Sequence, residues 1–297
     1  MSSNLTAREI LIYTILSIPA RENLVKKATA IRRRANWPRG QLEDLRVNRC
    51  RELLIEAGLR VPYYRDLFEE LGYRPTYFRE LCELERIPVL TRAKLDKNFN
   101  KLRNEKFSDS DLITVKTGGT TGEPIKILID KKSHSERALI THRSYSLMGR
   151  ELGERSLVIA GSPIDIQLAN SFIMKAKYYL YNTSVIPSFK LSPSSLEKLI
   201  HRIKRGNYNS ITAYCSVLDI IASYLEETDE CLSIPKIIPC AELVTEAQKE
   251  RWRTVFNAEI FEIYGSREMS AIAAETEEHD GLLVNGDRYH VEITNES

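Results

Sequence analysis

The 297-residue sequence is poor in cysteine and has neither a long apolar run nor a large net charge. Its five cysteines are an odd number, and no two are spaced as Cys-X-X-Cys, which argues against a disulfide framework and against a structural zinc site. Lys and Arg total 43 against 41 Asp and Glu, so the formal charge of +2 gives no reason to expect nucleic acid as a partner. We expect a globular, cytoplasmic protein with reduced thiols.

The longest apolar stretch, residues 10–20, is about half of the roughly 20 residues that a membrane-spanning helix needs. Polar residues interrupt it and Glu9 precedes it, which argues against a signal peptide. Basic residues follow at Lys26, Lys27 and positions 32–34, so a helix on a membrane surface is one alternative. We favour a helix packed on the protein with a solvated basic face, and therefore expect no membrane contact.

Residues 1–105 are expected to form a helical N-terminal region. Apolar residues recur with helical spacing over residues 41–57. Shorter helices are predicted over residues 63–71 and 78–84, and Thr91 is the predicted N-cap of another.

Residues 106–297 are expected to form an α/β nucleotide-binding portion of the same large domain. The predicted strands are 112–116, 125–130, 156–160, 177–181, 184–186, 210–214, 236–238 and 258–263. Helices are predicted to begin at Ser133, Ser194 and Ser216 and after Thr245. Alternation of strand and helix indicates an α/β fold with mixed, mainly parallel sheets flanked by helices.

The predicted strands also predict a place for a ligand. In mainly parallel sheets, ligands bind at the carboxyl ends of the strands. Four segments just past those ends are rich in small, hydroxyl and aromatic residues: 161–163, 214–216, 240–242 and 264–268. We therefore predict one composite site.

Eight consecutive residues between two predicted strands are Gly, Thr, Glu or Pro. They are Thr117, Gly118, Gly119, Thr120, Thr121, Gly122, Glu123 and Pro124. Glycines let a backbone approach a ligand, and Thr hydroxyls and backbone N–H groups donate to phosphate oxygens. The stretch lacks the ending of a Walker loop, and a glycine-rich hairpin turn is the alternative. The density of Gly and Thr favours phosphate binding.

Three motifs together resemble those of adenylate-forming enzymes. Residues 117–124 are similar to their phosphate loop, Tyr264-Gly265-Ser266-Arg267-Glu268 to their second nucleotide motif, and Ala241-Glu242-Leu243 to the motif before it. Within that superfamily, residues 36–54, 61–72 and 87–95 resemble the phenylacetate–CoA ligase and coenzyme F390 synthetase branch, including its capsule-associated, CapK-like members.

The resemblance implies ATP-dependent activation of a small carboxylic acid, with an aryl acid as the family-level expectation. Such enzymes use ATP and Mg²⁺ to form an acyl-adenylate and then transfer the acyl group to a thiol, usually coenzyme A. By resemblance, the phosphates would be held by residues 117–122. The adenine side would be lined by Ala241 and Glu242, and adenine would be bound by Tyr264, Gly265 and Ser266. Glu268 would ligate Mg²⁺.

Two of these residues have a purely structural alternative role. Tyr264 could be a core tyrosine, and Glu268 could be a carboxylate at a helix N-terminus. His134 and His142 are expected to be structural or solvated.

The sequence departs from the family in two respects. It contains no Thr-Gly-Asp, the family's ribose-holding segment, and Gly286-Asp287 comes too early and in a predicted turn. Thr276 and Leu283 stand where some relatives have zinc ligands. We expect a member that stops before the C-terminal lid domain, with a separate C-terminal domain or a homodimer as its partner. The alternative is an incomplete or inactive nucleotide-binding homologue with a regulatory or assembly role, for example in polysaccharide biosynthesis.

Overall fold

The computed structural model describes residues 4–116, 125–160, 171–188 and 193–293. The chain forms two compact units, each discontinuous in sequence: unit 1 comprises residues 1–30 and 137–285, and unit 2 comprises residues 31–136 and 286–297. The division expected at residue 105 stays a prediction. Within the described ranges, no helix is long and apolar enough to cross a membrane.

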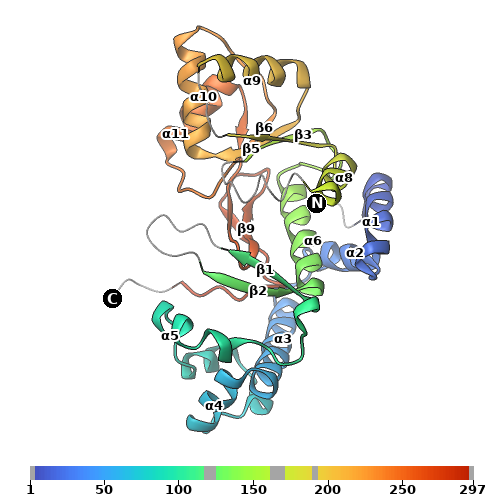
Figure 1. Ribbon diagram of the computed structural model, residues 1–297, viewed down its shortest axis with the longest axis vertical. Coiled ribbons are helices and arrows are strands. Elements are labelled where there is room, and N and C mark those ends of the chain that lie inside the picture. Colours follow the sequence, from blue (N-terminus) through green and yellow to red (C-terminus); the bar gives the residue numbers. More distant parts are fainter. Residues whose placement is uncertain (1–3, 117–124, 161–170, 189–192, 294–297) are drawn as a thin grey trace. The chain divides into compact units, whose positions relative to one another are not determined.

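Unit 2 contains the predicted helices and one hairpin (Figure 1). Its elements are α3 (Arg39–Arg60), α4 (Pro62–Glu70), α5 (Arg92–Lys97), the 3-10 helices η1 (Pro75–Tyr77), η2 (Leu81–Arg86), η3 (Phe99–Leu102) and η4 (Asp109–Asp111), and strands β1 (Leu112–Lys116) and β2 (Lys126–Asp130). The helices predicted over 41–57 and 63–71 are confirmed, and the Thr91 hydroxyl caps α5 by accepting from the Lys94 N–H at 3.3 Å. Where a helix was predicted over 78–84, the chain instead forms η2.

The hairpin of β1 and β2 confirms the two strands predicted around the Gly/Thr-rich stretch. The strands are antiparallel, from Leu112 opposite Asp130 to Lys116 opposite Lys126. Residues 117–124 themselves lie outside the described residues. Helix α6 (Lys131–Leu147) starts two residues before the predicted Ser133, because the Asp130 carboxylate accepts the Ser133 N–H at 2.9 Å and takes the capping role.

Unit 1 is built on a five-stranded sheet. Its elements in chain order are α1 (Ala7–Ala20), the start of α2 (Leu24–Arg34), most of α6, β3 (Ser156–Ala160), α8 (Phe172–Leu180), β4 (Thr183–Pro187), α9 (Pro193–Gly206), β5 (Ser210–Tyr214), α10 (Cys215–Glu227), β6 (Lys236–Cys240), α11 (Glu246–Phe256), β7 (Glu259–Ile260), β8 (Ile263–Ser266), β9 (Ser270–Glu275) and β10 (Leu282–Val284). The first sheet has the order β4-β3-β5-β6-β7 with every pair parallel, as predicted for an α/β fold.

The two faces of this sheet are covered by different elements. Leu157, Ile211, Ile237 and Ile260 lie in one row across the strands and are buried with apolar residues of α9, α10 and α11 (Figure 1). On the other face, Ile238 is buried in a cluster with residues of the second sheet and the end of α6. Helices therefore cover one face, and a second sheet contributes to covering the other.

That second sheet, β10-β9-β8, is antiparallel and corrects one predicted strand. Residues 258–263 were predicted as a single strand, but β7 ends at Ile260 and β8 begins at Ile263. The Phe261 N–H still bonds the Ile237 carbonyl at 2.9 Å, but from Ile263 onward the chain pairs with β9 instead of β6. The Glu262 N–H bonds the Glu275 side-chain carboxylate at 2.7 Å, while the Glu262 carbonyl accepts the Glu275 backbone N–H at 2.9 Å.

A second correction concerns residues 177–181, predicted as extended. They belong mostly to α8, because the Ser171 hydroxyl caps a helix upstream by accepting the Met174 N–H at 3.2 Å. The helix then continues through Leu180 before β4 begins.

Candidate functional site

The carboxyl ends of β5 and β6 bring two of the four predicted segments together. Tyr214 and Cys240, the last residues of the two strands, are directly opposite in the parallel register. The sheet changes direction of strand addition between β3 and β5, the position at which α/β sheets open a crevice. Residues 161–163, which follow β3, lie outside the described residues. The structure thus places residues 214–216 and 240–242 next to each other, and a composite ligand site there stays a prediction.

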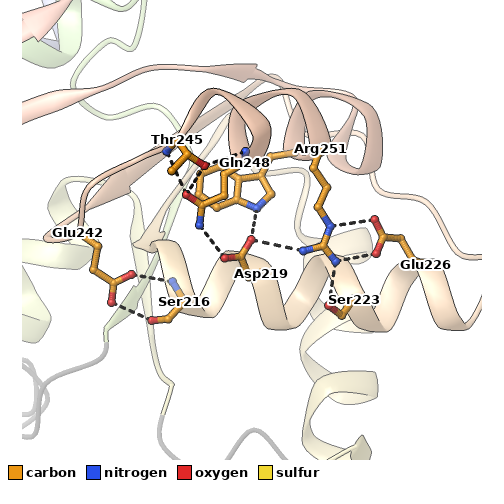
Figure 2. A network of polar contacts seen from close by, with 9 residues as sticks. Ser216, Asp219, Ser223, Glu226, Glu242, Thr245, Gln248 and Arg251 are labelled. Atoms are coloured by element: carbon orange, nitrogen blue, oxygen red, sulfur yellow. Dashed lines mark hydrogen bonds and ion pairs between the residues drawn. The ribbon is translucent and has the colours of Figure 1, made fainter.

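Glu242 closes the start of helix α10, as Figure 2 shows. Its carboxylate accepts the Ser216 backbone N–H at 2.7 Å and the Ser216 hydroxyl at 3.0 Å. The first N–H groups of a helix have no partner inside the helix and carry partial positive charge, so a carboxylate is favoured there. Ala241, just before it, has a left-handed backbone with φ of 65°. The Glu242 carboxylate therefore caps the N-terminus of helix α10.

Cys215, the first residue of α10, stays a thiol. Burial raises its pKa to about 11, with the nearby Glu242 and Asp219 carboxylates adding to the shift. Because the thiolate is the reactive form of cysteine, this residue is not an activated nucleophile at neutral pH.

A polar network between α10 and α11 supports this edge of the sheet (Figure 2). Asp219 accepts from the Gln248 amide at 2.8 Å and from the Trp252 indole N–H at 3.0 Å. Arg251 binds both Glu226 and Asp219, and Gln248 completes the capping box predicted with Thr245. Apart from that box, sequence reasoning missed the network, since its partners are 25 to 33 residues apart and no local spacing marks them.

The hairpin of β8 and β9 carries the second nucleotide motif. The Tyr264 side chain is 58% exposed, so the alternative of a core tyrosine is wrong. Gly265 lies so close to β9 that a Cβ there would be 2.1 Å from the Ser270 carbonyl oxygen. The Ser266 hydroxyl accepts the Met269 N–H at 3.1 Å and closes the turn. Of these three residues, Tyr264 presents its side chain outward, whereas Gly265 and Ser266 shape the hairpin.

Glu268 lies in the turn between β8 and β9 and is half-buried. The alternative of a helix-terminal carboxylate is wrong, because a strand rather than a helix follows the turn. Among the described residues, no side chain or backbone group bonds its carboxylate. Those residues also contain no group of three His, Cys, Asp or Glu that could hold a metal ion. Glu268 alone could hold Mg²⁺ only if oxygens of a bound ligand completed the coordination of the ion. Mg²⁺ is commonly bound in this way, by one or two carboxylates together with phosphate oxygens.

Helix α6 holds this hairpin through polar contacts that the sequence did not predict. The Thr141 hydroxyl bonds the Ser270 hydroxyl at 2.6 Å, and the Arg137 guanidinium donates to the Arg267 carbonyl. Arg143 donates to the Asn285 side-chain oxygen at 2.6 and 3.1 Å, and Asn285 donates to the Ala271 carbonyl. These partners are 14 to 142 residues apart.

His142 is structural, as predicted. Its Nδ1 lies 3.1 Å from the Tyr13 hydroxyl, and its ring packs against the Tyr13 and Tyr181 rings. Burial lowers its pKa to about 3, and the positive charges of Lys177 and Arg150 add to the shift. It is therefore neutral at physiological pH and packs α1 onto α6.

In unit 2, Asp287 lies in a turn, as predicted, and is 3% exposed. Its carboxylate pairs with Arg34 at 2.8 Å, and its backbone carbonyl accepts from Arg49 at 2.5 Å. The carboxylate thus already has a partner within its own unit.

No protein-family model matches this chain. No curated protein matches its sequence. Among solved structures, it is similar to a 2-hydroxyisobutyryl-CoA ligase in complex with 2-HIB-AMP and CoA in the thioesterification state, with a TM-score of 0.69, 20% identity, and 84% of this chain and 54% of that chain covered. The postadenylation state with 2-HIB-AMP gives a TM-score of 0.68 at 19% identity, covering 84% of this chain and 54% of that one.

An open conformation of the same ligase, with 2-HIB-AMP and CoA, gives a TM-score of 0.68 at 17% identity, covering 84% of this chain and 55% of that chain. The chain spans about half the length of these ligases. It has the α/β fold of the corresponding half of an adenylate-forming ligase.

Proposed function

We propose that this chain is the nucleotide-binding portion of an ATP-dependent ligase that activates a carboxylic acid as its adenylate. One observation carries the proposal. A single hairpin presents the exposed Tyr264 ring and the Glu268 carboxylate, which has no partner among the described residues, in a chain with the fold of a ligase solved with an acyl-adenylate and CoA.

Each proposed role follows from the chemistry of the side chain. The exposed Tyr264 ring would pack on adenine, and Glu268 would ligate Mg²⁺ as a hard oxygen donor. The Gly/Thr-rich residues 117–122 would donate to phosphate oxygens. Ala241 and Glu242 would shape the adenine side through the backbone, because the Glu242 carboxylate already caps α10. When bound, ATP and Mg²⁺ supply the activated phosphorus that a carboxylate captures with release of pyrophosphate.

A more specific proposal concerns the branch of ligases. The chain would be a phenylacetate–CoA ligase-like protein of the CapK-like branch, acting in the cytoplasm. It would take an aryl acid and pass the acyl group to a thiol such as coenzyme A. Its support is the resemblance of residues 36–54, 61–72 and 87–95 to that branch.

A second candidate is nucleotide binding without turnover, in a regulatory or assembly role such as polysaccharide biosynthesis. It is favoured by the buried Asp287, whose carboxylate pairs with Arg34 instead of being free for a ribose. The proposed partner in turnover is a separate C-terminal domain or a second copy of the chain.

Calorimetry with ATP and Mg²⁺ tests the binding that both candidates require. Binding should weaken at least about tenfold when Thr120 and Thr121 are both replaced by Val, since two hydroxyl donors to phosphate are lost. Tyr264→Ala should also weaken it, whereas Tyr179→Ala, at a tyrosine 89% exposed on α8, is the matched control and should have no effect. Unchanged affinity in both test variants would reject the proposed nucleotide site.

Pyrophosphate exchange separates the two candidates. Carboxylic acids including phenylacetate and 2-hydroxyisobutyrate would be tested with the chain alone and with a separately produced C-terminal ligase domain. Exchange stimulated by an acid supports the ligase. ATP binding with exchange at background in both conditions supports the second candidate.

A further inference from the structure

The two faces of helix α1 differ in a way that the sequence did not predict. Ile12 and Tyr13 are each 2% exposed, and the Tyr13 hydroxyl bonds His142. This face confirms the predicted packing on the protein. A solvated basic face was expected in this region, with a helix on a membrane surface as the alternative, but the opposite face of α1 is apolar.

That opposite face, the α1 outer face, consists of Leu11, Thr14, Ile15 and Ile18. Leu11 is 58% exposed, Ile15 42% and Ile18 78%, at spacings that align them on one side of a helix. Its one polar group is satisfied, since the Thr14 hydroxyl donates to the Ile10 carbonyl at 2.7 Å. An outer helix face in water normally carries charged residues, whereas this one needs no water for its hydrogen bonds.

Positive charge lies at the end of this face. A surface hollow of about 610 Å³ is lined by the apolar Ile18 and Val25, the charged Arg21, Glu22 and Lys26, and the polar Thr14, Ser17 and Asn23. Glu22 pairs with Lys27 at 2.9 Å. Arg21 and Lys26 are exposed, and neither has an ion pair with any residue that the structure describes. The hollow therefore combines apolar lining with two cations available to an anionic partner.

We propose that the α1 outer face docks on an anionic phospholipid surface. The apolar side chains would enter the boundary between headgroups and acyl chains, while Arg21 and Lys26 would reach the phosphate groups. This is peripheral contact, distinct from spanning, and it replaces our expectation of no membrane contact. The proposal does not depend on the proposed function.

The size of the face argues for lipid over a second copy of the chain. A 14-residue helix is about 21 Å long and about 10 Å wide, so the face covers about 200 Å². A stable protein interface needs about 800 Å² on each partner. A lipid surface requires neither that area nor a complementary shape, and it supplies the negative charge that matches Arg21 and Lys26.

Sedimentation with vesicles tests the proposal on the full chain. Wild type should bind vesicles of phosphatidylcholine with 30% phosphatidylserine. Leu11→Gln/Ile18→Gln should lower the vesicle-bound to free ratio at least about tenfold. The matched control is Leu53→Gln/Leu59→Gln, two leucines 68% and 63% exposed on α3, which should bind like wild type. Circular dichroism at 222 nm and the thermal midpoint verify that each variant is folded.

The charges have their own test. Arg21→Gln/Lys26→Gln should remove the preference for phosphatidylserine over pure phosphatidylcholine, and raising NaCl should weaken binding of wild type but not of this variant. Failure of wild type to bind phosphatidylserine vesicles, or equal binding by Leu11→Gln/Ile18→Gln and Leu53→Gln/Leu59→Gln, would overturn the proposal. A dimer in analytical ultracentrifugation that is lost in Leu11→Gln/Ile18→Gln, without vesicle binding by wild type, would assign the face to self-association instead.

Discussion

Glu242 and Glu268 each follow a strand of unit 1, yet their carboxylates have different surroundings. Glu242 is held by the Ser216 N–H and hydroxyl at the start of α10. Glu268 has no bonding partner among the described residues, because its turn is closed by the Ser266 hydroxyl and the Met269 N–H instead. The comparison shows that position after a strand does not define a ligand. Glu242 lies next to a helix start that bonds its carboxylate, whereas the turn that holds Glu268 is followed by a strand.

The two places also differ in how they are held. At the ends of β5 and β6, the parallel register and the contacts between α10 and α11 come from segments close in sequence. The β8–β9 hairpin depends on α6, from Arg137 to Ser144, more than 100 residues away. The Glu268 carboxylate, which no described residue bonds, thus lies on the part of unit 1 whose support is long-range. Four substitutions test this contrast, from the largest expected change in stability to the smallest.

Asn285→Ala should cause the largest loss, about 3 kcal/mol of unfolding free energy. Asn285 is 3% exposed and is the acceptor for the buried Arg143 guanidinium, which would keep its charge but lose that partner. Urea unfolding measures the loss. The control is Asn48→Ala on the exposed side of α3, with an expected change within about 0.5 kcal/mol. A loss below about 1 kcal/mol for Asn285→Ala would contradict long-range support of the hairpin.

Gly265→Ala should cost about 2 kcal/mol, because the added Cβ would meet the Ser270 carbonyl oxygen at 2.1 Å and force the strands apart. Thermal unfolding with the same scan rate for all variants is the measurement. Gly40→Ala is the control, since a Cβ there meets nothing within 4 Å and alanine favours a helix. If both variants are equally stable, the close approach of β8 and β9 does not restrict this position.

Sequence reasoning predicted the parts of the fold that local patterns determine. Alternating residues predicted β1 and β2, the repeat of strand and helix predicted β5 and β6, and the Thr245–Gln248 spacing predicted the cap of α11. It failed at the step from β7 to β8, where the chain stops pairing with β6 and starts pairing with β9, a change of partner that the local residue pattern does not encode.

For the candidate site, the sequence predicted which segments carry polar and aromatic residues, but not which side chains are free. Whether Glu242 is bonded depends on where α10 begins, and the support of the hairpin depends on Arg143 and Asn285, 142 residues apart. No spacing within a motif encodes such contacts. The roles of residues 117–122 stay a prediction.

Glu242→Gln should lower stability by about 1 kcal/mol. The amide keeps one acceptor for Ser216 but loses the charge that favours a helix N-terminus. The loss should shrink as NaCl rises from 0.05 to 0.5 M, because salt screens that charge. Glu250→Gln, at a carboxylate 75% exposed within α11, is the control with an expected change near zero. A loss that is the same for both glutamates would mean that the cap at α10 contributes nothing specific.

Glu268→Gln should have the smallest effect on stability, below about 0.5 kcal/mol, because no described residue bonds its carboxylate. Under the proposed function, it should nevertheless reduce ATP affinity at least about tenfold in the presence of Mg²⁺ and leave metal-free ATP binding unchanged. Glu242→Gln should do the reverse, with lower stability and normal Mg²⁺ dependence. Calorimetry with ATP, with and without Mg²⁺, compares the two variants directly.

If both variants keep normal Mg²⁺ dependence while wild type binds ATP, the nucleotide proposal survives but the metal contact lies elsewhere. If Glu242→Gln alone loses that dependence, the carboxylate that caps α10 must leave the helix when nucleotide binds, and the assignment of free and bound carboxylates is reversed.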